Sequence, residues 1–172
     1  MNSWIFVSDK INIEIICDVD VSIDSIKALE EISKIVLRQN SVNYFNANIL
    51  LTDDETIKDL NYRYRGLNEV TDVLSFSDKY QGQYYGDVSQ SNDLDESLEF
   101  LLPEDIKFQL GEIAISVPQA IRQAKFNLES ELIKLVAHGF LHLLGYDHIL
   151  PAERIIMEKL ESEAIDEVSD IV

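Results

Sequence analysis

Residues 137–148 read AHGFLHLLGYDH and contain all three histidines of this 172-residue chain, His138, His142 and His148. The apolar residues of this stretch recur at helical spacing, and two histidines four residues apart leave one face of a helix, one turn apart. Gly145 supplies the left-handed residue that ends such a helix, and the following turn returns the third histidine toward the pair. The sequence therefore predicts a three-histidine site beside a central, largely covered helix.

Three imidazoles predict a metal site with an open position. Imidazole nitrogens bind zinc at about 2.0–2.1 Å, and three protein ligands leave the fourth tetrahedral place to water. Zinc lowers the pKa of that water from about 15.7 to roughly 7, which supplies a nucleophile at neutral pH. Zinc is the predicted ion, with nickel or another divalent metal as the alternative. A structural zinc would need a fourth ligand, and the only cysteine, Cys17, is remote in sequence. One or more of the histidines could instead be a hydrogen-bonded core residue.

Three segments of the chain share a pattern with a known family. Residues 138–148 fit HGxLHLxGYDH, residues 60–76 read LNYRYRGLNEVTDVLSF, and residues 111–115 read GEIAI. Together they resemble the YbeY family of metal-dependent endoribonucleases, associated with ribosomal RNA maturation, over about Val42–Leu160. The resemblance implies a single compact zinc-hydrolase-like domain.

The resemblance also implies roles for individual residues. His138, His142 and His148 would bind the ion and form the catalytic centre with Arg65. The guanidinium of Arg65 would grip a phosphate or stabilise charge developing on it, and a surface salt bridge is the alternative for this residue. Asp147 has two interpretations that the sequence leaves open: it orients a ligand histidine, or it shapes the turn.

The net charge of −18 is unexpected for a nuclease, because phosphate contacts dominate affinity for nucleic acids. The acidic residues are concentrated in 93–105 and 153–172, whereas basic residues gather in 58–65. More bases precede the histidines, namely Arg122, Lys125 and Lys134. A local basic groove on an acidic body is one interpretation of this pattern. Solvated helix faces are the other.

Length and composition indicate one domain, residues 1–172. No run reaches the roughly 18 apolar residues of a membrane span, and the first twenty residues do not have the pattern of a signal peptide. Cys17 cannot pair within the chain. We therefore expect a cytoplasmic protein without membrane contact. No glycine-rich phosphate loop is present, and no organic cofactor is expected.

The pattern of apolar residues predicts a mixed α/β (α+β) fold, in which a sheet of about four to five strands packs with about five helices. Strands are expected at Trp4–Val7, Ile11–Cys17, Asn43–Leu51, Val70–Phe76 and Gln109–Ser116. Helices are expected at about 24–40, 52–64, 118–126, 130–144 and 151–168. A long acidic loop or hairpin is expected at about 79–107.

Three further details can be tested by a structure. Thr52 and Glu55, three residues apart, are expected to form a capping box that opens the second helix. Thr71 and Asp72 are expected either to bond to local backbone at a strand start or to have a direct role. The last helix is expected to bury a stripe of apolar residues, namely Ile155, Ile156, Leu160 and Ala164, with its charged residues outward.

The leading hypothesis is a metal-dependent endoribonuclease that hydrolyses single-stranded RNA in ribosomal RNA maturation, including processing of the small-subunit 3′ end, and in ribosome quality control. Its expected partners are ribosomal RNA and ribosomal or ribosome-assembly proteins. A zinc peptidase is a rival, but protease motifs place glutamate directly after the first histidine, where this chain has Gly139. A non-catalytic ribosome-assembly factor with a structural zinc is the second rival, favoured by the acidic charge.

Overall fold

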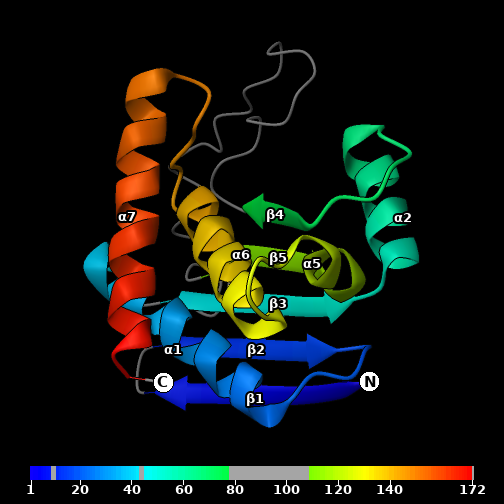
Figure 1. The fold of residues 1–172 in the computed structure, drawn as a ribbon, viewed down its shortest axis with the longest axis horizontal. Helices are drawn as coiled ribbons and strands as arrows, with labels where there is room; N and C mark the ends of the chain where they lie inside the picture. The colour runs from blue at the N-terminus through cyan, green and yellow to red at the C-terminus, as the bar shows by residue number, and fades with distance from the viewer. Residues whose placement is uncertain (9–10, 43–44, 78–108, 172) are drawn as a thin grey trace, which may run out of the picture.

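The computed structural model describes residues 1–8, 11–42, 45–77 and 109–171, so the acidic loop expected at about 79–107 lies outside the described residues. The centre of the structure is a five-stranded sheet with the order β1-β2-β3-β5-β4 (Figure 1). The inner pairs β2–β3 and β3–β5 are parallel, and the outer pairs are antiparallel. The strands are β1 (Asn2–Ser8), β2 (Ile11–Cys17), β3 (Phe45–Thr52), β4 (Val73–Ser77) and β5 (Gln109–Ser116).

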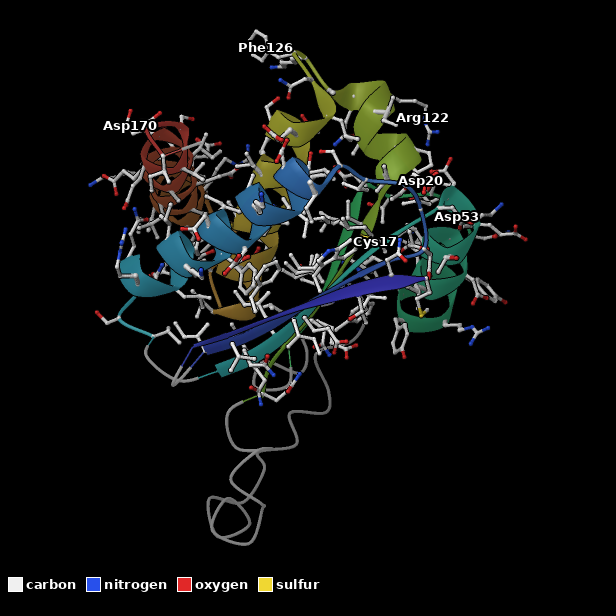
Figure 2. The ribbon with its side chains drawn as sticks, turned by 90° about the horizontal axis from the view of Figure 1, so that it is seen from below. Cys17, Asp20, Asp53, Arg122, Phe126 and Asp170 are labelled. Atoms are coloured by element: carbon white, nitrogen blue, oxygen red, sulfur yellow. The ribbon has the colours of Figure 1, made fainter. Side chains whose placement is uncertain are left out.

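Five helices pack on this sheet among the described residues, which confirms the predicted mixed fold. Figure 2 shows α1, α6 and α7 gathered on one side of the sheet. The helices are α1 (Ile23–Gln39), α2 (Asp54–Arg65), α5 (Val117–Gln123), α6 (Leu128–Leu143) and α7 (Pro151–Ser169). Within the described ranges, none of them has the length and apolar character needed to span a bilayer.

Side-chain alternation along the strands separates two hydrophobic clusters. Ile113 and Ile115 of β5 belong to the large core that α1, α6 and α7 cover, whereas Ala114 between them points to the opposite face. There it meets Ile57 of α2 and Leu74 of β4. Helix α2 therefore lies on the other face of the sheet from α6.

Helix α6 crosses the sheet closely at Gly139. A Cβ built on this residue would lie 2.9 Å from the Cδ1 atom of Ile113, closer than packed carbon atoms tolerate. Any side chain at this position would force Ile113 to shift, so glycine is what lets α6 approach β5 to this distance. This approach fixes the height of the neighbouring His138 above the sheet.

The predicted start of the second helix was wrong by one residue. Asp53, not Thr52, caps α2, because its carboxylate accepts a hydrogen bond from the Thr56 N–H at 2.8 Å. Thr52 is fully buried and still pairs with Ser116 of β5, so it is the last residue of β3. Register with a distant strand, which local spacing does not reveal, decides this boundary.

The predicted buried stripe of the last helix was also partly wrong. Ile155 and Ile156 are 67% and 52% exposed, whereas Ala164 is buried as expected. The buried residues of α7 are Met157, Ala164 and Val168. Because α7 packs mainly against α1 and α6, through one narrow stripe, residues one or two positions before Met157 turn away from that stripe.

Candidate metal centre

The chain leaves α6 through a tight turn that places the third histidine. Gly145 has a φ of 91°, and its N–H donates to the carbonyl oxygen of His142 at 2.9 Å. The N–H of Tyr146 donates to the Leu141 carbonyl at 3.0 Å, which completes a Schellman motif. The predicted left-handed role of Gly145 is confirmed. The Tyr146 hydroxyl also donates to Oδ1 of Asn40 at 2.8 Å and ties the turn to the end of α1.

The three histidines meet at one point. His138, His142 and His148 each offer a ligand nitrogen, and these atoms all lie within 4.8 Å of one another. The Nε2 atoms of His138 and His142 are 3.1 Å apart. Two nitrogens that bind one zinc ion tetrahedrally at 2.0–2.1 Å would be about 3.3 Å apart. The donor set and its spacing therefore suit a metal ion.

The outer nitrogens of the first two rings face acceptors. His142 Nδ1–H donates to the carbonyl oxygen of Tyr146 at 2.9 Å, and His138 Nδ1 lies 3.5 Å from Oε2 of Glu161 on α7. These acceptors favour the tautomers with the proton on Nδ1, in which both Nε2 atoms are bare lone pairs. Two lone pairs that face each other at 3.1 Å repel unless a cation or a proton lies between them. This arrangement is suited to a cation.

Burial keeps one of these imidazoles neutral. The pKa of His142 is lowered from 6.5 to about 4, first by desolvation and then by the positive charges that His138 and His148 carry when protonated. A neutral imidazole is the form that binds a metal. His142 therefore has its lone pair available throughout the neutral range.

Of the two roles that the sequence leaves open for Asp147, the structure shows the turn-shaping one, and a carboxylate near a histidine ring comes from Glu161 instead. The Asp147 carboxylate accepts from the backbone N–H of His148 at 2.7 Å, which is the turn-shaping role. Glu161 was assigned to a solvated face, yet its side chain is only 14% exposed and faces His138. Its position four residues after Met157 and three before Ala164, on the buried stripe of α7, is the signal that could have identified it.

A cavity of about 590 Å³ opens beside His138 and His148, between α6, α7 and the start of β4. Asp72 lines it at the sheet end. Oδ1 of Asp72 accepts from the Val73 N–H at 2.8 Å, and Oδ2 accepts from Nε2 of Gln123 at 2.9 Å. The local backbone bond expected for Asp72 is confirmed.

Arg65 is not part of the lining of this cavity. It is the half-buried last residue of α2, seven positions before Asp72, and α2 packs on the opposite face of the sheet from α6. The structure thus brings the three histidines together, whereas Arg65 ends a helix that packs on the other face of the sheet.

The sequence and the fold are similar to those of known proteins. The family model described as Endoribonuclease YbeY matches residues 14–169. The Endoribonuclease YbeY of Brevibacillus brevis is 42% identical over 123 residues, which cover 70% of this chain and 72% of the relative. That of Desulforamulus reducens is 32% identical over 153 residues, covering 87% and 90%. The solution structure of TM1509 from Thermotoga maritima, 26% identical, superimposes with a TM-score of 0.54 over 91% of this chain and 88% of that one.

Proposed function

The chain belongs to the YbeY endoribonuclease family, and on that premise we propose that it is a metal-dependent endoribonuclease that hydrolyses phosphodiester bonds in single-stranded RNA. One observation carries the metal dependence. The Nε2 atoms of His138 and His142 face each other at 3.1 Å, with His148 beside them. A half-buried pair of imidazoles in this arrangement is unfavourable without a cation.

We assign the ion to His138, His142 and His148, with zinc as the expected occupant and nickel as the alternative. A bound divalent ion supplies Lewis acidity, which activates water and neutralises charge on the phosphate. The chain's own residues keep the ligands in position. The Tyr146 carbonyl holds the ring of His142, and the Glu161 carboxylate faces that of His138.

We further propose that Arg65 contacts the RNA outside the cavity. Its guanidinium suits a phosphate, because two parallel N–H donors match two phosphate oxygens. A strand that leaves the histidines along the β4 end of the sheet would approach the carboxyl end of α2. Arg65 would then stabilise charge on the substrate without touching the ion.

Ribosomal RNA is the proposed substrate, and ribosomal or ribosome-assembly proteins are the proposed partners. We also propose that the chain forms one domain and that it acts in the cytoplasm. The family membership supports the substrate. Burial raises the pKa of the Cys17 thiol to about 11, so this cysteine stays a protonated core residue, as suits a reducing compartment.

The sharpest test combines elemental analysis with a cleavage assay. Purified protein should contain about one equivalent of zinc or nickel and cut an unstructured, end-labelled RNA, and a chelator should stop the cutting until metal is restored. His142→Ala should lose both the metal and the activity. Cutting at the wild-type rate by the metal-free variant would refute the proposal.

The two rivals predict different results. If metal is retained and no RNA is cut, a non-catalytic assembly factor is favoured, and a folded His142→Ala protein would then still support ribosomal RNA maturation in cells. A zinc peptidase would need glutamate at position 139. Any Cβ there lies 2.9 Å from Ile113, which argues against a side chain at this position.

A further inference from the structure

Two cations line the cavity beside the histidines. Lys134 lies on α6 and Arg154 on α7, so they face the cavity from its two helical walls. Neither has a carboxylate within ion-pair distance in the part of the chain that the structure describes, whereas six other described lysines and arginines do. On a chain of net charge −18, these two cations create a local positive field beside the candidate catalytic centre.

The positions of the cations relate them to the metal ligands. Lys134 precedes His138 by four residues on the same helix, about 6 Å along the axis on the same face. Arg154 stands near the start of α7, six residues after His148. Both side chains are exposed at the cavity and able to meet a ligand. The positive groups thus flank the site where a phosphate would react.

The carboxylates of the same cavity are partly occupied. Asp72 accepts hydrogen bonds at both of its oxygens, and Glu161 faces His138. Glu158 is the remaining acid and is exposed on α7. The two cations are therefore the cavity's main groups available to an anionic ligand.

We propose that this cavity binds the backbone of single-stranded RNA, with Lys134 and Arg154 on the phosphates that flank the scissile bond. The inference rests on the proposed function and adds the residues that hold the strand. A positive groove that follows the backbone is the general means of binding single strands without sequence preference. It also explains how an acidic protein tolerates a polyanion, since the attraction is local.

The test compares Lys134→Ala/Arg154→Ala with Lys58→Ala/Lys125→Ala, which removes the same charge from exposed positions outside the cavity. Binding of a fluorescent single-stranded RNA to the metal-loaded proteins is followed by anisotropy over a range of salt concentrations. The cavity variant should bind about tenfold more weakly at moderate salt. The slope of log affinity against log salt should fall by about 1.4, because each single-strand phosphate contact contributes about 0.7.

The control pair should change affinity by less than about twofold, the range of a screened surface charge. Lys134→Arg/Arg154→Lys should bind as the wild type does, because the charge is kept. Equal affinities and slopes for the cavity and control pairs would overturn the inference. The binding assay is independent of cleavage: if the wild type binds through these residues yet cuts no RNA, the nuclease proposal fails and the binding site stands.

Discussion

The two faces of the sheet are covered unequally. On one face α1, α6 and α7 bury a continuous core that includes every buried apolar residue of α6, whereas on the other face α2 covers a cluster of three buried residues, Ile57, Leu74 and Ala114. The histidine pair projects from the first arrangement and Arg65 ends the helix of the second. The larger core therefore lies under the histidines, whose mutual distances decide whether they can share one ion, whereas the end of α2 rests on a much smaller cluster.

Matched leucine truncations measure this contrast directly. Leu141 of α6 is fully buried and Leu74 of β4 is 1% exposed. Leu141→Ala should lower the free energy of unfolding by about 4 kcal/mol and Leu74→Ala by about 2 kcal/mol, since a void in the large core collapses less. Urea unfolding of the metal-free proteins gives both values. Equal losses would mean that the two faces are packed alike.

Substitutions at the end of α2 test whether the second face takes part in the reaction. Arg65→Ala should lower kcat/KM on RNA by about 100-fold, the usual effect of removing one electrostatic contact to a developing charge. The matched control is Arg63→Ala, because Arg63 is on the same helix and pairs with Asp59 at 2.7 Å. The control should stay within about twofold. If both variants cut RNA equally well, Arg65 has no special role and function belongs to the first face alone.

The sequence predicted the parts of this arrangement that are local. The spacing of His138 and His142 and the glycine at 145 lie within eleven residues, so the helix and the turn that ends it bring the imidazoles together. The order of strands and helices also follows from local periodicity. Glu161 escaped because its partner, His138, lies 23 residues earlier on a different helix. Only the packing of α7 against α6 makes that contact.

A smaller effect is expected from the carboxylate that α7 contributes to the first face. Glu161→Gln should raise the dissociation constant for zinc by about 10- to 100-fold, because a carboxylate beside a ligand histidine orients the ring and raises its basicity. Unfolding in the absence of metal should change little. Competition with a chelating dye measures the affinity, and Glu158→Gln, exposed on the same helix, is the control. Identical zinc affinities for the two variants would mean that Glu161 contributes to packing and not to metal binding.

The sheet order illustrates a limit of sequence reasoning. β5 inserts between β3 and β4, so Ser116 of β5 pairs with Thr52 of β3, and this pairing keeps Thr52 in the strand. The capping box expected at Thr52 and Glu55 does not form, because Thr52 pairs with a strand residue about sixty positions away. Arg154 was missed for the same reason, since it joins Lys134, one of the bases already noted before the histidines, only when α7 folds back beside α6.

The last expected effect concerns pH and compares the two faces of the sheet once more. In the metal-free protein the pKa of His142 is about 4, against about 6.5 when unfolded. Between these two pH values the unfolded chain binds more protons than the folded one. The contribution of neutral His142 to the free energy of unfolding is therefore complete above pH 6.5 and is lost as the pH falls toward 4. His142→Gln should flatten the curve of unfolding free energy against pH in that window. Leu74→Ala should leave its slope unchanged, and Leu141→Ala, which opens the core beside His142, should reduce it. If Leu74→Ala reduced the slope of unfolding free energy against pH as much as Leu141→Ala does, the packing of α6 would not be the cause of the lowered pKa of His142.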